Sequence, residues 1–529
     1  MRWLLLALLF SVPLFAAEIN PKEAGSTQLS FELAWVLEGE PPFTLKTFGF
    51  KNYSFQVVSF SSADEFTRET DSYGNSRITF HLAGVTKRRI TVQGTAAINY
   101  ANGLEQAGDA GNFLEETVFV ELTPEIGVKA RQITEGAEND FQKMVLLTEW
   151  VHNNVAYDES YGQRQCTSSE AFADLRGTCD EESHLLIAFA RSLNVPARFV
   201  AGFVHSGESW GAHAWVEFAF EGEWVPADPT FNELGLLDAT HLKFAHGQDQ
   251  ADIAQEVTEG VEVQVLAPEI ELNNEQSFNL PYEYSFYSLP EEAGPGAVVD
   301  ARVLVQSLSK DYLAAPLSIV VPTEPPELAV KLVESTDKLV YLPPKGKQVA
   351  EWRLVFPHAF KEGYAYNFSI QVNSMGSSIH EIIAGSGQVG ADAVSSALVN
   401  ELSAGFENGS VAITVEIANS GNTLYSANAS CEFEGQQQTK QVSIPVGGST
   451  LLQFVFNDPK KDFLTGEITL SNPQKTVRQP FELTVEHAQP TPAADSSNAS
   501  LGVAAIGALL IAAAFVILHR PREPCIQAG

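Results

Sequence analysis

Cysteine is scarce in this sequence: 529 residues contain four, Cys166, Cys179, Cys431 and Cys525. So few thiols exclude a scaffold held together by many disulfides. Two of the four are set aside for reasons given below: Cys179 is a candidate nucleophile, and Cys525 follows a predicted membrane span. Only Cys166 and Cys431 are then left as candidates for a disulfide. They lie far apart in the sequence, and no feature of the sequence decides whether they form a disulfide.

Positive charge is also scarce, because 32 Lys and Arg residues face 66 Asp and Glu residues, which gives a formal net charge of −34. A surface this acidic repels phosphate, so nucleic acid is excluded as a partner. Metal patterns are missing as well: no histidine pair stands at zinc-ligand spacing with a cysteine pair, and no segment resembles a calcium loop. We expect no metal and no cofactor, although the many carboxylates leave weak Ca²⁺ binding open.

Both ends of the chain carry apolar runs. Residues 1–17 combine a basic start, an apolar stretch and small residues at the exit, which is the pattern of a secretory signal peptide. Residues 501–518 contain no charge and span about 27 Å as a helix, enough to cross a membrane. Basic residues in the tail, 519–529, predict that this end is cytoplasmic. We therefore expect a single-pass protein of the cell membrane with residues 18–500 outside the cell.

The segment Gly177-Thr178-Cys179 places a thiol at the start of a predicted helix. Residues 180–193 follow with apolar side chains at helical spacing. At a helix N-terminus, unpaired N–H groups and the helix dipole favour a thiolate over a thiol. Carboxylates at positions 180–182 oppose this effect, because nearby negative charge disfavours thiolate formation. The sequence predicts a nucleophile at Cys179 and leaves its reactivity open.

A histidine and an aspartate follow on two predicted strands. His213 lies in the alternating run 212–218, and Asp228 ends the run that starts at 223, just before a proline. Adjacent strands can hold the imidazole against the carboxylate while the helix presents the sulfur to the other ring nitrogen. This is the nucleophile, base and orienter arrangement of acyl transfer. The alternatives are a core histidine and a turn-forming aspartate.

Residues 139–247 resemble the transglutaminase-like superfamily, which has a papain-like core with a Cys-His-Asp triad. The resemblance rests on segments in the family's order: Glu149 to Tyr157, Gly177 to Cys179, Leu193 to Gly202, His213 to Glu217 and Trp224 to Thr230. It implies an α+β core in which Cys179 forms a thioester, His213 acts as general base and acid, and Asp228 orients the imidazole.

The resemblance also suggests what surrounds these three residues. Trp215 and Trp224 are expected as packing residues that line the cleft. The backbone N–H of Cys179 is the expected donor to the oxyanion. A second donor is expected from the preceding segment, around residues 161–165.

The chain is expected to be multidomain, with this α+β core flanked by all-β domains, because strand-like alternation with turn signals fills the segments on both sides. Within the core we expect a helix at 141–155 and a short closing helix at 238–244. In chain order the expected units are a signal peptide (1–17), an N-terminal β domain (18–126), the transglutaminase-like domain (127–252), a β-sandwich (253–383), a linker (384–396), an Ig-like β-sandwich (397–487), a Pro/Ala/Ser stalk (488–500), a transmembrane helix (501–518) and a cytoplasmic tail (519–529).

These features predict a thiol enzyme displayed outside the cell that attacks amide bonds of a protein or peptide substrate. If water accepts the acyl group, the result is a protease or amidase, and if an amine accepts it, the result is a cross-linker; the sequence does not separate them. The alternative is a weakly active or inactive adhesion or binding protein with the same fold, which the carboxylates after Cys179 favour. Cleavage of an Asn–glycan amide bond is a third hypothesis, although no carbohydrate-binding module is recognisable.

Overall fold

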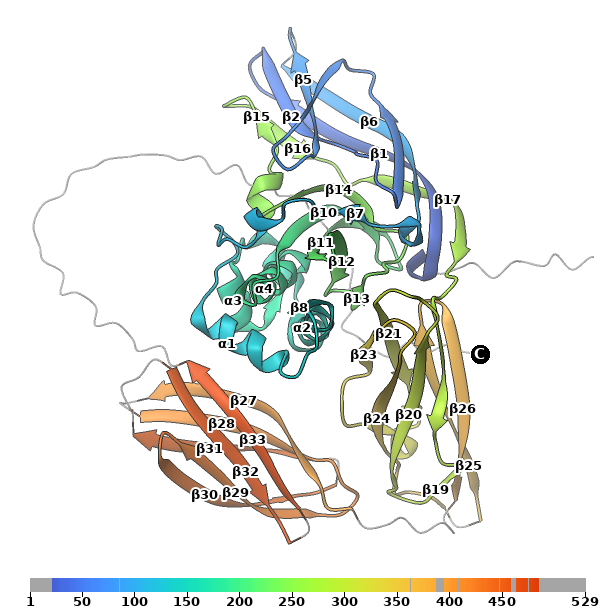
Figure 1. Cartoon of the computed structure of the whole chain (residues 1–529), viewed down its shortest axis with the longest axis vertical. Helices are drawn as coiled ribbons and strands as arrows, with labels where there is room; N and C mark the ends of the chain where they lie inside the picture. Colours follow the sequence, from blue (N-terminus) through green and yellow to red (C-terminus); the bar gives the residue numbers. More distant parts are fainter. Residues whose placement is uncertain are drawn as a thin grey trace, which may run out of the picture.

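The computed structural model describes residues 21–484, except 85, 362, 387–393, 408–409, 447, 458–462 and 474. An α+β unit lies at the centre, with a β domain on one side and two β-sandwiches on the other (Figure 1). The predicted signal peptide, stalk, transmembrane helix and tail lie outside the described residues, as does part of the predicted linker. Within the described residues, no helix is both long and apolar enough to span a membrane.

The N-terminal β domain consists of two sheets whose facing sides enclose an aromatic-rich core that includes Phe31, Trp35 and Phe80. One sheet has the order β16-β1-β6-β3, with β17 also on β1, and the other has the order β15-β2-β5-β4. The strands are β1 Ala24–Glu38, β2 Phe43–Gly49, β3 Gln56–Ser61, β4 Phe66–Thr70, β5 Ser76–Leu82, β6 Lys87–Ile98, β15 Glu256–Val257, β16 Glu262–Val265 and β17 Glu269–Ser277.

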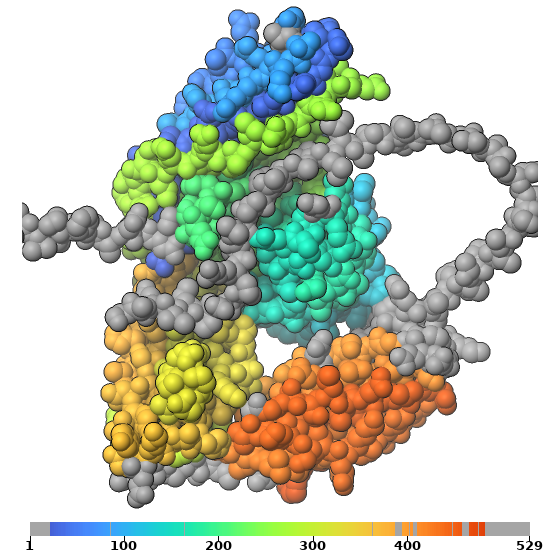
Figure 2. Space-filling view, turned by 180° about the vertical axis from the view of Figure 1, so that it is seen from behind, coloured from blue at the N-terminus to red at the C-terminus, as the bar shows by residue number. Residues whose placement is uncertain are grey.

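Residues 256–277 differ from the prediction that a β-sandwich begins at 253. The predicted strand at 262–265 is present, but it pairs with β1 of the N-terminal domain, where Val265 lies opposite Trp35. β17 pairs with the same strand, and this yellow-green segment lies against the blue domain in Figure 2. An alternating pattern predicts a strand but carries no information on which sheet that strand joins.

The central unit is an antiparallel sheet covered by helices. Its strand order is β13-β12-β11-β10-β14, with β7 also on β12. The helices predicted at 141–155 and 180–193 are present as α2 and α4, each shifted by one residue. The elements are β7 Glu105–Gln106, β10 Ala197–His205, β11 Trp210–Phe220, β12 Glu223–Asp228, β13 Glu233–Leu234, β14 Leu242–Gly247, α1 Pro124–Ile133, α2 Asp140–Asn154, α3 Ser168–Asp174 and α4 Cys179–Ser192; β8 Ala156–Tyr157 and β9 Arg176–Gly177 form a separate two-stranded parallel pair.

The central sheet is buried on both faces. Val216 and Phe218 of β11 belong to the core shared with the helices, whereas Trp215 of the same strand belongs to the core of the N-terminal domain. Successive strand residues point to opposite faces, so this division follows directly from their positions. The N-terminal domain is therefore part of the scaffold of the central sheet.

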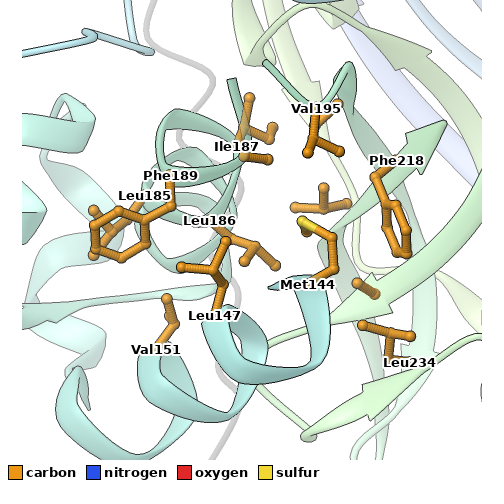
Figure 3. Close-up of a cluster of buried hydrophobic side chains, with 14 of the residues drawn as sticks. Met144, Leu147, Val151, Leu185, Leu186, Ile187, Phe189, Val195, Phe218 and Leu234 are labelled. Atoms are coloured by element: carbon orange, nitrogen blue, oxygen red, sulfur yellow. The ribbon is translucent and has the colours of Figure 1, made fainter. Parts of the chain in front are cut away.

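Apolar packing between α2 and α4 fixes the start of α4. Met144 and Leu147 of α2 face Leu186 and Phe189 of α4 (Figure 3), and all four side chains are fully buried. Each buried side chain of this size contributes about 1.5–3 kcal/mol relative to exposure. The first residue of this anchored helix is Cys179.

Residues 238–244, which were predicted to form a short closing helix, form a turn followed by the start of β14. Asp238 Oδ1 accepts a hydrogen bond from the N–H of Thr240 at 2.9 Å, as in an Asx turn. β14 then pairs with β10. The apolar spacing of this segment fits a helix, but residues 242–247 hydrogen-bond to β10 instead, so tertiary pairing overrides the local pattern.

Two β-sandwiches follow, and the first begins at β18, after the strands that join the N-terminal domain. The first packs the sheet β18-β20-β24-β22 against β19-β26-β25-β21-β23, and the second packs β27-β28-β31 against β30-β29-β32-β33. Their strands are β18 Tyr282–Ser288, β19 Glu292–Ala293, β20 Val298–Ser307, β21 Leu313–Val320, β22 Lys331–Leu332, β23 Asp337–Leu342, β24 Lys347–Val355, β25 Ala365–Ser374, β26 Ser377–Ser386, β27 Ala397–Glu407, β28 Ser410–Asn419, β29 Tyr425–Phe433, β30 Gln436–Ile444, β31 Ser449–Asn457, β32 Phe463–Ser471 and β33 Thr476–Thr484.

The edge strand β23 of the first sandwich contacts α2. The Glu149 carboxylate accepts a hydrogen bond from the N–H of Leu339 at 3.0 Å. The Asn139 side chain donates to the Tyr341 hydroxyl at 2.9 Å. Leu339 and Tyr341 also belong to the apolar core of the central unit, so the sandwich completes that core.

A side chain at Gly202 of β10 has no room in this packing. A Cβ at this position would come within 2.3 Å of the Leu242 carbonyl oxygen and 2.6 Å of the Trp215 ring. We expect Gly202→Ala to destabilise the central unit by about 1–3 kcal/mol, because the neighbours must move, and scanning calorimetry will show this as a lower transition temperature. Gly405→Ala is the matched control, since nothing lies within 4 Å of its added Cβ. Equal transition temperatures for the two variants would contradict the close approach.

Candidate active site

Cys179 is held at the N-terminus of α4 by a capping box. The Glu181 carboxylate accepts hydrogen bonds from the N–H and the hydroxyl of Thr178, at 2.8 Å and 2.7 Å. The Cys179 side chain is only 9% exposed and shares an apolar cluster with Ala214 of β11. The thiol is thus placed beside the residue that follows His213.

The charge state of this thiol follows from its surroundings. Burial raises the pKa of the Cys179 thiol well above its usual value, and the neighbouring Asp180 raises it further, while the N–H of Ala214 acts in the opposite direction. The resting side chain is therefore a neutral thiol. It becomes a nucleophile only when a base removes its proton.

The three carboxylates after Cys179 have different surroundings. Burial, with Glu181 adding to it, raises the pKa of Asp180 to about 7. Glu181 caps the helix, as described above. Glu182 accepts a hydrogen bond from the Thr230 hydroxyl at 2.6 Å, which ties α4 to the loop after β12. In addition to burial, all three carboxylates raise the pKa of the Cys179 thiol, Asp180 most strongly, and Glu181 and Glu182 also support the local structure.

His213 and Asp228 are brought together by the pairing of β11 with β12. His213 Nε2 lies 2.7 Å from Asp228 Oδ2 in a fully buried contact. The other carboxylate oxygen accepts hydrogen bonds from the N–H groups of Thr230 and Phe231, at 2.8 Å and 3.1 Å. Burial opposes ionisation of Asp228, but its interactions with His213 and His241 outweigh burial and lower the pKa of the carboxyl.

His213 Nδ1 makes no hydrogen bond to any described residue, and no hydrogen bond joins the ring to Cys179. The ring shares its face of β11 with Trp215, whereas Cys179 approaches β11 at Ala214. Burial lowers the pKa of His213, so the ring is neutral at rest. His213 and Asp228 are therefore in contact, and the thiol stands near them as a separate neutral group.

The two predicted tryptophans have different locations. Trp215 is fully buried and stacks on His213 with ring centroids 6.2 Å apart. Trp224 lies in a separate small cluster with Phe113, under the Arg198 guanidinium at 4.1 Å. The ring that packs closest to His213 is instead Phe231, at 4.9 Å.

A second histidine on Asp228 escaped the sequence analysis. His241 Nε2 lies 2.9 Å from Asp228 Oδ2, the same oxygen that bonds His213. Its Nδ1 lies 3.1 Å from the Asp238 carbonyl oxygen. The sequence predicted a helix at residues 238–244. A helix at this position does not indicate that the His241 ring contacts Asp228 at the end of β12.

Two groups of side chains come close enough to be considered as metal sites. Within each group the potential ligand atoms lie within 4.8 Å of one another; the groups are His213, Asp228 and His241, and Glu233, Asp238 and His241. Both depend on His241, whose ring nitrogens already face oxygen acceptors, and the Lys22 ammonium pairs with Asp238. Metal ions need deprotonated imidazole and are repelled by a neighbouring cation. These residues fit a proton-linked network better than a metal centre.

Tyr157 is a further neighbour of the thiol. Its strand β8 pairs in parallel with β9, which places Tyr157 opposite Gly177, two residues before Cys179. Burial raises the pKa of the Tyr157 hydroxyl, and the interaction with Cys179 raises it further. By contrast, in the segment 161–165, where a second oxyanion donor was expected, the Tyr161 hydroxyl donates to Asp174 at 2.7 Å. Tyr157 is therefore placed by its strand pairing close to the start of α4.

Removing the negative charge of Asp180 should make Cys179 more reactive. Asp180→Asn is expected to raise the rate of Cys179 labelling by iodoacetamide severalfold at pH 8–9, because a nearby anion disfavours the thiolate. The effect should vanish at acidic pH, since Asp180 itself becomes neutral below its pKa of about 7.

Peptide mass spectrometry reports this labelling residue by residue. Cys431, whose pKa burial raises to about 12, serves as the internal reference and should label equally slowly in both proteins. Equal labelling rates of Cys179 at every pH would contradict the assigned effect of Asp180.

Comparisons with known proteins give matches of different extent. An uncharacterized protein of Mycobacterium leprae (strain TN) is 23% identical over 149 residues, which are 27% of this chain and 52% of that protein. The chain thus spans about half the length of this relative. A candidate cysteine protease from Cytophaga hutchinsonii is 19% identical with a TM-score of 0.40, over 48% of this chain and 93% of that one. Red sea bream transglutaminase is 12% identical with a TM-score of 0.17, over 88% and 96% of the two chains.

A family profile described as the transglutaminase-like superfamily matches residues 128–229. The match runs from α1 to the end of β12 and includes Cys179, His213 and Asp228. The resemblance noted from the sequence is thereby confirmed for this part of the chain. Residues 128–229 form a domain of the transglutaminase-like superfamily.

Proposed function

We propose that this protein is a thiol acyl-transfer enzyme of transglutaminase-like type that attacks amide bonds through a thioester on Cys179. The observation that carries the proposal is the buried 2.7 Å contact of His213 Nε2 with Asp228. This contact fixes the ring so that Nδ1 is left for the proton of a nucleophile. The N-terminus of α4 brings a thiol to the next residue of the same strand. Base, orienter and nucleophile are the set that acyl transfer needs.

The first half of the reaction forms the thioester. His213 Nδ1 takes the proton from Cys179 Sγ as the sulfur bonds to the amide carbon. The carbonyl oxygen becomes an oxyanion, and the C–N bond then breaks as the imidazolium returns the proton to the leaving amine. In the second half, water or an amine attacks the thioester and gives its proton to His213, which passes it back to the sulfur. A neutral thiol beside a neutral imidazole is the starting state that this sequence requires.

We consider two donors to the oxyanion. Cys179 is the first residue of α4, and the N–H groups of a first helical turn have no partner within the helix. Tyr157 pairs with Gly177, two residues before the thiol, and we propose its hydroxyl as the second donor. Donors that are fixed before the reaction stabilise developing charge without reorganisation.

The site is closed at rest, which bears on the choice of acceptor. Cys179, His213 and Asp228 are 9%, 4% and 0% exposed. A substrate must therefore displace part of the covering structure to reach the sulfur, and a closed site restricts the access of water to the thioester. This favours an amine acceptor, and hence cross-linking, over hydrolysis.

The setting that we propose is the cell surface. The apolar runs at 1–17 and 501–518 and the basic tail after them support export and a single membrane anchor. The substrates would then be external proteins or peptides. The strongly acidic composition agrees with the exclusion of nucleic acid.

A weakly active surface-binding protein is the competing function. One observation favours it: the Cys179 thiol is buried and its pKa is raised, not lowered. On this hypothesis the three residues are retained for the fold, and neither peptide cleavage nor amine incorporation depends on Cys179.

Replacement of the thiol distinguishes these functions. Incubation of the purified full chain with a protein mixture and a fluorescent primary amine is expected to give amine incorporation, and Cys179→Ala is expected to lose it completely. Mass spectrometry counts incorporated amine and new peptide N-termini in the same samples, so hydrolysis is scored as well. Cys431→Ala, which removes a buried thiol in the second sandwich, is the control and should retain activity. If Cys179→Ala matches the unmodified protein, the enzymatic proposal is wrong.

The Tyr157 hydroxyl gives a second prediction. Tyr157→Phe removes one oxyanion donor and is expected to lower kcat by about 10²-fold with little change in KM, as for other single donors. Tyr161→Phe is the matched control, because that hydroxyl bonds to Asp174, and it should leave kcat unchanged. An equal kcat for the two variants would remove Tyr157 from the reaction.

A further inference from the structure

His241 differs from His213 in what its two ring nitrogens face. Nε2 lies 2.9 Å from Asp228 Oδ2, and Nδ1 lies 3.1 Å from the Asp238 carbonyl oxygen and 3.4 Å from Asp238 Oδ2. All of these atoms are acceptors only. A neutral imidazole carries one N–H and can satisfy one of the two sides, whereas an imidazolium carries two. The geometry is that of a charged ring.

The charges around His241 lead to the same state. Asp228 and Asp238 are both fully buried, and buried carboxylates require paired cations. The Lys22 ammonium pairs with Asp238 and lies 3.1 Å from the centroid of the Phe231 ring. Asp228 then needs a cation of its own. If His213 supplied that charge at rest, it could not act as a base, which leaves His241.

Other groups around His241 do not change this balance. Burial raises the pKa of Glu233 to about 7, with Asp238 adding to the effect, so this carboxyl is neutral only below that pH. The Tyr100 hydroxyl donates to the His241 carbonyl oxygen at 3.1 Å. Aromatic rings also contact His241, with the Trp215 centroid at 5.2 Å and the Phe231 centroid at 6.0 Å. The charged groups next to His241 are Asp228, Asp238 with its partner Lys22 and, above about pH 7, Glu233, so each carboxylate there favours a charged ring.

We propose that His241 is a positioning residue of the acyl-transfer site, a permanent imidazolium that neutralises Asp228 and thereby keeps His213 neutral and ready to accept a proton. This inference rests on the proposed function. Asp228 alone would stabilise a proton on His213, because a carboxylate next to an imidazole favours its charged form. With His241 on the same oxygen, the carboxylate still fixes the His213 ring by a hydrogen bond but no longer holds a proton on it.

The direction of the electrostatic effects agrees with this role. Burial opposes protonation of His241, but Asp238 and the hydrogen bond to Asp228 outweigh burial and raise its pKa to about 10. His241 is in turn one of the groups that lower the pKa of His213.

The test is the pH profile of kcat/KM for the full chain, measured with the amine-incorporation assay. A general base must be neutral, so activity falls as the pH drops through the pKa of His213. His241→Gln keeps a donor to Asp228 and loses the charge, so the pKa of His213 rises and the acid limb moves to higher pH. Between pH 8 and pH 6 the variant should lose roughly threefold more activity than the unmodified protein. His241→Lys restores the charge and should return the limb towards its original position.

His246→Gln is the matched control. His246 is also a buried histidine of the same sheet, but its Nε2 faces the Tyr73 carbonyl oxygen at 3.0 Å, and Lys243, Arg198 and Glu105 are the charges that act on its pKa. The acid limb of the kcat/KM profile of His246→Gln should lie at the same pH as that of the unmodified protein. An acid limb that is the same in His241→Gln, His246→Gln and the unmodified protein would overturn the proposal, as would an upward shift in His246→Gln of equal size.

A second measurement does not depend on turnover or on a folded variant. Nitrogen NMR of histidine side chains in the unmodified protein is expected to show His241 protonated on both ring nitrogens at pH 7–8 and His213 protonated on Nε2 alone. A neutral His241 in this range would end the proposal even if the protein is active. An inactive protein with a charged His241 would instead overturn the enzymatic function and leave the charge assignment standing.

Discussion

The arrangement of this site depends on one buried carboxylate, that of Asp228. One of its oxygens is held by two backbone N–H groups of the following loop, and the other accepts both histidine rings. A carboxylate without water must have all of its acceptor capacity used, or its burial would cost several kcal/mol. The positions of β11, the loop after β12 and the start of β14 are all set by this requirement.

The N-terminal β domain belongs to this site as much as the helical layer does. Trp215, Leu237 and Leu242 pack into its core, and Lys22 reaches from its first turn to Asp238. The central unit is therefore supported by two layers: the helical layer carries Cys179 at the start of α4, and the β domain packs against Trp215 and pairs Lys22 with Asp238. The first sandwich supports α2 from the outside through Leu339 and Tyr341.

The sequence predicted those features of the fold and the site that depend on local signals. It did not predict those that depend on contacts between segments far apart in the chain. Cys179 and α4 were predictable because a capping residue and an apolar repeat are local signals. His213 and Asp228 were predictable because they lie on strands that are neighbours in both sequence and space. The role of His241 was not predictable, since it depends on a side-chain turn at Asp238 and on a contact with a strand that is not its neighbour in the sheet. The strands of 256–277 were misassigned for a related reason, because pairing with β1 spans more than two hundred residues.

The described part of the chain contains no covalent cross-link, since Cys166, Cys179 and Cys431 are all free and buried. Folding of the described residues therefore does not depend on an oxidising environment, because a reducing agent finds no disulfide among them to open. Two of the three sulfurs act only as small apolar side chains. Because all three sulfurs are buried, an electrophile or oxidant can modify them only when the surrounding structure opens, so modification of Cys179 would report on local opening at the start of α4.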